Sequence, residues 1–108
     1  ALLFSDFGTI TLASFISPYR AARARIRARH EQENLPFFEV FVDTPLSVCE
    51  ARDPKGLYRK ARSGQLSGMT GIDAPFEAPL NPDLRLDGEA ELKVSIQALL
   101  SLLGLQST

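Results

Sequence analysis

Two stretches of the chain share one pattern, in which a run of apolar and β-branched residues leads into Ser-Pro or Thr-Pro. Thr9–Ile16 form the first run, with Ser17-Pro18 after it, and Phe37–Val42 form the second, with Thr44-Pro45 after it. Such runs indicate strands covered on both faces. Ser or Thr before Pro is typical of an N-cap followed by the first helical residue. Two such units in succession predict an α/β fold with parallel strands and right-handed crossovers.

Other periodic stretches predict the remaining elements. We expect a helix over residues 18–30, a short helix over Leu57–Arg62 and a short strand over Leu84–Leu86. Residues 2–7 have the composition of the last turns of a helix that Gly8 would end. The last helix is predicted to be capped by Asp87 or Gly88, to carry Glu89 and Glu91 in its first turn and to end at Gly104. Its apolar residues form one stripe, which consists of Leu92, Ile96, Leu99, Leu100 and Leu103.

Composition is that of an ordinary globular chain. Of 108 residues, 44% are hydrophobic and 23% are charged, and the net charge is −1. This balance provides no global field to attract nucleic acid or membrane surfaces, and no apolar run approaches the roughly 20 residues of a membrane-spanning helix. Cys49 is the single cysteine, which excludes an intrachain disulfide and is consistent with a reducing, cytoplasmic location.

Basic residues are segregated along the chain. On the first predicted helix, Arg20, Arg23 and Arg27 form one stripe, while Arg25 and Arg29 form another. Residues 52–71 are glycine-punctuated and carry a second basic group, comprising Arg52, Lys55, Arg59, Lys60 and Arg62. A basic segment with glycine hinges is typical of a lid. The alternative is that both groups are solvated surface charge.

The junction at Ser17 is a candidate anion site. The carboxyl end of a parallel strand and the amino end of a helix meet there, where ligands of α/β folds gather and anions are favoured. The alternative is that Ser17 only caps the helix. Asp43, at the end of a strand, could take the place of a magnesium-associated carboxylate, although a turn before Pro45 explains it equally well. The single histidine, His30, falls at the end of the first predicted helix, where a cation is favoured, so we do not expect a Ser–His or Cys–His nucleophile.

Four motifs occur in one order and with regular spacing. They are Phe15-Ile-Ser-Pro-Tyr-Arg20, Phe38-Glu-Val-Phe-Val-Asp43, Val48-Cys-Glu-Ala-Arg-Asp-Pro-Lys-Gly-Leu-Tyr58, and Thr70-Gly-Ile-Asp73 with Phe76-Glu77 after it. Together, from residue 1 to about Leu86, they resemble adenylylsulfate kinase. That family phosphorylates adenosine 5′-phosphosulfate (APS) on its 3′ hydroxyl with ATP to give 3′-phosphoadenylyl sulfate in sulfate assimilation. The resemblance implies a P-loop NTPase, nucleotide kinase-like fold with helices flanking a parallel sheet.

The resemblance also implies roles for particular residues. Ile16 and Ser17 fall where the family contacts APS, Arg20 lies near the anionic substrate, and Lys55 matches the lid lysine over APS. Ser17 is also the family's phosphoserine position. Because in-line transfer between two nucleotides requires no covalent carrier and no base accompanies Ser17, we expect this serine to bind substrate.

Two positions depart from the family pattern. Gly68 and Met69 fall on its Gly-Phe pair, so Met69 replaces a ring that holds the adenine, and Ser67 stands where many members have lysine. ATP is the implied co-substrate. No G-x-x-x-x-G-K-[ST] occurs in these residues, so this chain alone should not turn over ATP. We expect it to be the C-terminal portion of a single kinase domain, with the P-loop and most Mg²⁺ ligands upstream and no metal site of its own.

Two alternatives remain open at this point. The chain could belong to a non-catalytic, APS kinase-like regulatory domain of an ATP sulfurylase, or its arginine helix could bind nucleic acid, which the near-neutral charge opposes. Besides APS and ATP, the expected partners are a second copy in a homodimer and, by fusion or association, ATP sulfurylase. Neither nucleic acid nor a membrane is expected.

Overall fold

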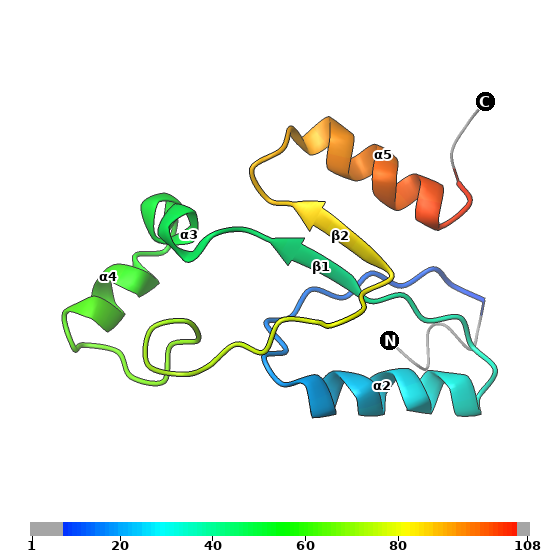
Figure 1. The fold of residues 1–108 in the computed structure, drawn as a ribbon, viewed down its shortest axis with the longest axis horizontal. Helices are drawn as coiled ribbons and strands as arrows, with labels where there is room; N and C mark the ends of the chain where they lie inside the picture. Colours follow the sequence, from blue (N-terminus) through cyan, green and yellow to red (C-terminus); the bar gives the residue numbers. More distant parts are fainter. Residues whose placement is uncertain (1–7, 106–108) are drawn as a thin grey trace.

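The computed structural model describes residues 8–105, which form helices and two short strands (Figure 1). Residues 2–7, predicted to finish a helix, lie outside the described residues. The elements are α2 (Arg20–Gln32), β1 (Val40–Asp43), α3 (Leu46–Arg52), α4 (Leu57–Arg62), β2 (Leu84–Asp87) and α5 (Leu92–Leu102).

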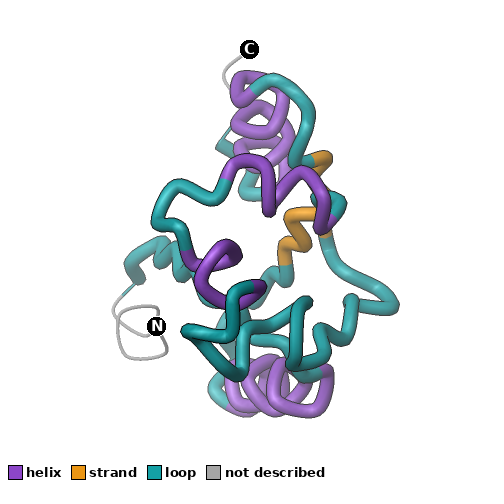
Figure 2. Tube along the Cα trace, turned by 90° about the vertical axis from the view of Figure 1, so that its left-hand side faces the viewer, coloured by secondary structure: helices purple, strands orange, loops and turns teal. Residues whose placement is uncertain are grey.

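The two strands form a parallel pair. Val40 lies opposite Leu84, and the register runs without a bulge to Asp43 opposite Asp87. Figures 1 and 2 show α2 on one side of the strands and α5 on the other, with α5 packed on β2. The predicted parallel α/β arrangement is therefore confirmed for this pair of strands.

The predicted strand over Thr9–Ile16 is wrong. Residues 9–19 form neither strand nor helix, and Leu12, Phe15 and Ile16 are 72%, 82% and 66% exposed. A strand exists only through hydrogen bonds to a neighbour, and in the described residues the sheet consists of β1 and β2 alone. The apolar sequence is present, but no strand of the described part lies beside it.

Three predicted helix starts are displaced along the chain. Tyr19, rather than Ser17, is the N-cap of α2, and Pro45, rather than Thr44, is the N-cap of α3. Pro45 has ψ of 141°, an extended conformation that places the first helical turn after it. Glu91 is the N-cap of α5, so Glu89 and Glu91 precede its first turn instead of lying in it. Helix α4 has the predicted bounds.

Glycine is needed at two positions of the described part, Gly104 and Gly88, for two different structural reasons. Gly104, at φ of +71°, follows α5, and the N–H of Leu105 donates to the carbonyl of Leu100, so the predicted glycine end is confirmed. At Gly88 there is no room for a side chain, because a Cβ there would lie 1.6 Å from Oγ1 of Thr44. Its N–H donates to the carbonyl of Asp43 at 2.9 Å, which brings the ends of β1 and β2 together.

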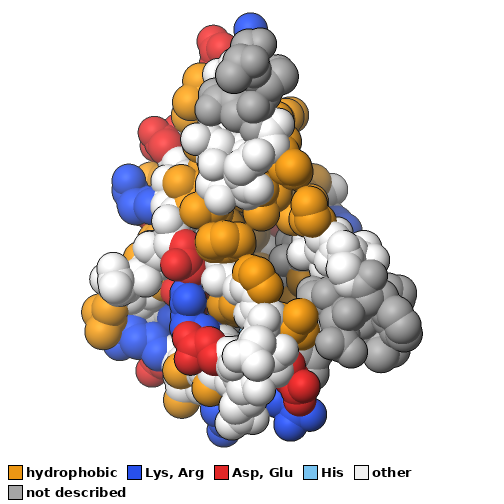
Figure 3. Space-filling view, turned by 90° about the vertical axis from the view of Figure 1, so that its right-hand side faces the viewer, with side chains coloured by type: hydrophobic (Ala, Val, Ile, Leu, Met, Phe, Trp, Pro, Cys, Tyr) orange, Lys and Arg blue, Asp and Glu red, His pale blue; other side chains and the backbone are white. Residues whose placement is uncertain are grey.

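Apolar side chains remain on the surface of the described part. Within residues 8–105, no apolar side chain is buried, and the buried residue is His30, at 6% exposure. Its Nδ1 lies 2.9 Å from the carbonyl oxygen of Ile26, and its ring packs against Phe37. Figure 3 shows hydrophobic side chains gathered at the middle of one face. None of the described helices is both long enough and apolar enough to cross a membrane.

Candidate functional site

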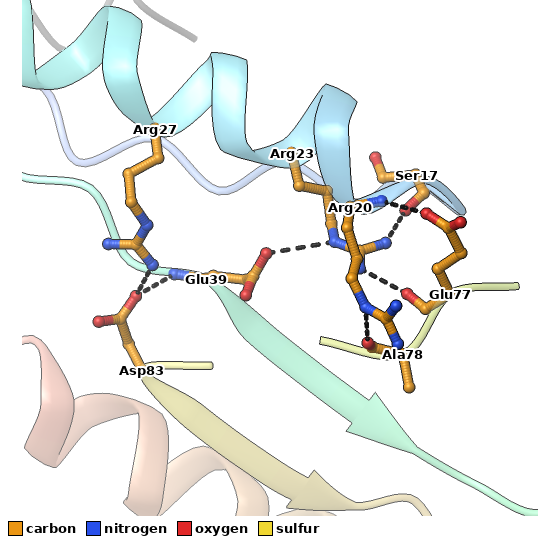
Figure 4. A network of polar contacts seen from close by, with 8 residues as sticks. All are labelled: Ser17, Arg20, Arg23, Arg27, Glu39, Glu77, Ala78 and Asp83. Atoms are coloured by element: carbon orange, nitrogen blue, oxygen red, sulfur yellow. Dashed lines mark hydrogen bonds and ion pairs between the residues drawn. The ribbon is translucent and has the colours of Figure 1, made fainter. Parts of the chain in front are cut away.

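The amino end of α2 is capped by a side chain from a distant part of the sequence. Oε1 of Glu77 accepts the backbone N–H of Arg20 at 2.8 Å, and the Glu77 N–H donates to the carbonyl of Pro18 at 2.8 Å. Nε of Arg20 donates to the carbonyl of Ala78, also at 2.8 Å (Figure 4). A carboxylate of the protein therefore occupies the helix end where the sequence predicted an external anion. Ser17 does not cap α2, and it has φ of 43°.

Arg23 joins the same two segments through their backbones. Its two terminal nitrogens donate to the carbonyl oxygens of Ser17 and Glu77, each at 2.5 Å. We call these two hydrogen bonds the arginine bridge. Nε of Arg23 lies 3.3 Å from a carboxylate oxygen of Glu39 as an ion pair without hydrogen-bond geometry. The guanidinium stands 5.8 Å from the ring centre of Phe76.

Arg27 makes a second link, nearer the carboxyl end of α2. Its guanidinium donates to Oδ2 of Asp83 at 2.5 Å and lies 5.1 Å from the ring centre of Phe37. The same carboxylate oxygen accepts the N–H of Glu39 at 2.6 Å. Partial burial raises the pKa of Asp83, but the Glu39 N–H and the Arg27 guanidinium outweigh it, so the pKa lies below its ordinary value.

The two predicted arginine stripes therefore have different environments. Arg20, Arg23 and Arg27 face the loop before β2 and the start of β1, as Figure 4 shows. Arg25 and Arg29 are exposed, and Arg29 is 3.8 Å from Glu33 in an i,i+4 pair. The first stripe makes contacts within the protein that the spacing alone did not reveal, because its partners Glu77, Ala78 and Asp83 lie more than fifty positions along the chain.

Residues 52–71, the predicted lid, are held by local polar contacts. Gly56, Gly64, Gly68 and Gly71 all have positive φ, a conformation that glycine adopts readily. The Asp53 carboxylate accepts the N–H groups of Tyr58 and Arg59 at 3.1 Å and so caps α4. Movement of this segment stays a prediction.

Two cations of this segment already have partners. Arg62 pairs with Glu50 at 2.8 Å, and Arg52 donates to the carbonyl of Gly88 at 2.9 Å. Lys55 is exposed in the turn between α3 and α4. Of the basic residues here, Lys55, Arg59 and Lys60 make no ion pair within residues 8–105, so they could meet an anionic ligand.

The structure places the predicted substrate residues in two groups. Ile16, Ser17 and Arg20 lie at the start of α2, whereas Lys55 and the Gly68–Met69 pair belong to the glycine-rich segment. The N–H of Gly68 donates to Asp73 at 2.7 Å, and the Met69 carbonyl accepts the N–H groups of three following residues. Within the described part of the chain, no hydrogen bond or ion pair links the two groups. Glu77 and Arg23, which organise the first group, were not predicted as site residues, although Glu77 belongs to a quoted motif.

An open hollow of about 360 Å³ lies between α3 and α4, and none of the predicted substrate residues lines it. Its lining consists of Glu50, Ala51, Arg52, Asp53, Tyr58, Arg59 and Arg62. Burial, followed by the neighbouring Cys49, raises the pKa of Tyr58. Three arginines and two carboxylates line this hollow, and Arg62 is paired with Glu50, so it offers little free positive charge for a multiply charged anion.

Asp43 is engaged in an ion pair. Its Oδ2 accepts from Nε of Arg85 at 2.7 Å, across the β1–β2 pair. Among residues 8–105, no group of three or more His, Cys, Asp or Glu is arranged to hold a metal ion. Asp43 is the last residue of β1, and its carboxylate is bound to Arg85, which is the contact that the structure shows for it.

Known proteins resemble this chain over most of its length. The family model described as adenylylsulphate kinase matches residues 1–87. Adenylyl-sulfate kinase from Lactiplantibacillus plantarum is 55% identical over 95% of this chain and 49% of its own length. The corresponding protein from Escherichia coli O1:K1 / APEC is 50% identical over 95% of this chain and 50% of its own length. The chain therefore spans about half the length of the curated relatives it matches.

A solved structure agrees in backbone as well as sequence. The Mycobacterium tuberculosis APS kinase in complex with AMPPNP and APS has a TM-score of 0.91 and 47% identity, over 94% of this chain and 59% of that one. The shared part confirms the expected α/β fold of the P-loop kinase class. The chain belongs to the adenylylsulphate kinase family.

Proposed function

We propose that this chain is the APS-binding and lid portion of an ATP-dependent adenylylsulfate kinase, which transfers phosphate to the 3′ hydroxyl of APS. The observation that carries the proposal is the TM-score of 0.91, at 47% identity, with an APS kinase solved with APS and AMPPNP. The family's substrate motifs around Ser17 and Lys55 are present, which favours the catalytic alternative over a regulatory domain of ATP sulfurylase.

The proposed substrate residues form two groups: one lies at the start of α2, and the other belongs to residues 52–71 and approaches the substrate when that segment closes. Ile16 and Ser17 contact APS from the turn before α2, and Arg20 contributes positive charge beside that turn. Lys55, on its exposed turn, contacts the anionic groups of APS when residues 52–71 close, and Gly68 and Met69 border its adenine. Ser17 acts in substrate binding rather than as a phosphate carrier.

The remaining assignments concern the full-length protein. ATP is the phosphate donor, and most of the Mg²⁺ ligands belong to the P-loop portion of the full-length protein. We place the protein in the cytoplasm because the one cysteine of this chain, Cys49, is free. We also propose that the full-length protein is a homodimer. Fusion to ATP sulfurylase remains a proposal of the same kind.

The test uses the full-length protein, an ATP-coupled assay with APS, and calorimetry with APS. We expect phosphate transfer by the parent protein. We expect Lys55→Ala to weaken APS binding by about tenfold or more, since a charge-assisted contact is lost. Lys93→Ala removes the same charge from the exposed side of helix α5, outside residues 52–71, and should leave APS affinity unchanged.

Three outcomes would contradict parts of this proposal. APS binding without phosphate transfer would favour the regulatory domain. Absence of APS binding by the parent would overturn the substrate assignment. Equal affinity of the Lys55→Ala variant and its parent would overturn the role of Lys55.

A further inference from the structure

Ser17 has a backbone conformation that requires support. Its φ of 43° lies in the left-handed region, where a residue with a Cβ is disfavoured. Asn34 is the other non-glycine residue with positive φ in the described part of the chain. Such a conformation persists when surrounding contacts hold it, and it is often found at ligand sites.

The arginine bridge supplies that support. One terminal nitrogen of Arg23 holds the Ser17 carbonyl and the other holds the Glu77 carbonyl, each at 2.5 Å. The Arg23 side chain is 11% exposed, so both hydrogen bonds are shielded from competing water. Glu39 and Phe76 confine the same guanidinium from other directions. A planar fork held in this way fixes the position of the Ser17 carbonyl.

Glu77 completes a closed set of contacts around the turn. Its N–H binds the Pro18 carbonyl, its carboxylate binds the Arg20 N–H, and its carbonyl accepts from Arg23 (Figure 4). Two of these hydrogen bonds attach Pro18 and Arg20 directly to Glu77, and the third attaches Arg23, which in turn holds the Ser17 carbonyl. The Arg20 amide at the start of α2 is occupied by this carboxylate, so the turn before the helix is the part left to meet a ligand.

We propose that Arg23 is a positioning residue for APS, acting through the backbone of Ser17. The inference rests on the proposed function, because Ile16 and Ser17 are the substrate contacts that it assigns. The arginine bridge holds the turn in its bound shape before APS arrives, so that binding does not lose free energy to ordering it. Without the bridge, Ser17 relaxes toward negative φ, and both contact residues move away from the positions that fit the ligand.

The experiment compares Arg23→Ala with Arg27→Ala in the full-length protein. Arg27 is on the same helix and binds Asp83, so its removal also loosens α2 but does not touch the Ser17 turn. We expect Arg23→Ala to raise the Kd of APS by about tenfold, the effect of losing charge-assisted hydrogen bonds. The Kd of AMPPNP should change by less than about twofold in both variants, and Arg27→Ala should retain the parent's affinity for APS.

Arg23→Lys serves if the alanine variant does not fold. Lysine keeps the charge but lacks the planar fork that reaches two carbonyls, so APS affinity should still fall. The proposal is overturned if Arg23→Lys, or a folded Arg23→Ala, binds APS as tightly as the parent. It is also overturned if Arg23→Ala and Arg27→Ala weaken APS and AMPPNP binding alike. Failure of the proposed function shows differently, as a parent protein that does not bind APS.

Discussion

The carboxylate of Glu77 caps helix α2 by accepting the backbone N–H of Arg20 at 2.8 Å, although the two residues are 57 positions apart. Helix caps are usually supplied by the residue at the N-cap itself. Here Tyr19 occupies the N-cap and makes no side-chain cap hydrogen bond. The loop before β2 thus determines where the first helix begins.

Replacing Glu77 tests this distant cap. Glu77→Ala leaves the Arg20 N–H without its acceptor and should lower the free energy of unfolding by about 1 kcal/mol, as loss of an N-cap does. Glu77→Gln keeps an acceptor oxygen and should lose only the smaller contribution of a negative charge near a helix start. Urea denaturation of the full-length protein measures both. Equal stability of Glu77→Ala and the parent would show that water replaces the cap.

The lowered pKa of Asp83 predicts that the free energy of unfolding depends on pH. Its folded-state pKa lies below its ordinary value, because the Glu39 N–H and Arg27 outweigh the effect of burial. The unfolded state therefore takes up the proton at a higher pH than the folded state. The resulting stabilisation is complete above the unfolded pKa, about 4, and is lost as pH falls through the folded pKa.

The Asp83→Asn variant isolates that contribution. The difference in urea midpoint between parent and variant should be largest near neutral pH and should shrink below about pH 4. Asp87→Asn, at the other end of β2, controls for removing one carboxylate from that strand. A difference between the parent and Asp83→Asn that stays constant down to pH 3 would contradict the assignment.

Substitution of Met69 by an aromatic residue is expected to tighten APS binding. Its carbonyl, rather than its side chain, organises the turn by accepting the N–H groups of Ile72, Asp73 and Ala74. A new side chain should therefore leave this backbone intact. If Met69 borders the adenine, Met69→Phe adds a stacking ring and should tighten APS binding severalfold, within the roughly 1–3 kcal/mol of a base–aromatic contact.

Met69→Leu is the matched control for this change, because leucine is apolar without a ring. Calorimetry with APS on the full-length protein compares the three forms. We expect the leucine variant to bind like the parent. Tightening by leucine as well as phenylalanine would mean that hydrophobicity, rather than stacking, limits the affinity.

Local sequence signals predicted those elements whose stability is local. The short helix α4 lies within the range Leu57–Arg62 that its composition indicated, and both strands of the β1–β2 pair overlap their predicted ranges. Thr9–Ile16 has an equally good strand sequence but no strand beside it in the described part. Pairing is a property of two segments, and the sequence of one cannot establish it.

The site could be predicted only in part, for a similar reason. The helical spacing of Arg20, Arg23 and Arg27 correctly placed them on one face. The contacts of that face depend on Glu39, Glu77 and Asp83. These residues reach α2 only through tertiary folding, which leaves no pattern in the sequence around the arginines. The motif resemblance indicated Ser17 as a ligand contact, but the left-handed φ of Ser17 became evident only with the coordinates.

The span of the α2 contacts has a consequence for how the polypeptide acquires its shape. The hydrogen bonds from Arg20, Arg23 and Arg27 to residues 77, 78 and 83 join positions 54 to 58 apart. At about 5–20 residues per second, a ribosome needs roughly 3–12 s to synthesise that interval. During this delay helix α2 lacks these contacts, although nearer partners such as Glu39 and Phe37 are already present, and closing so large a loop comes late and slowly. Docking of α2 should thus be among the last events of folding, and the turn at Ser17 should be completed with it.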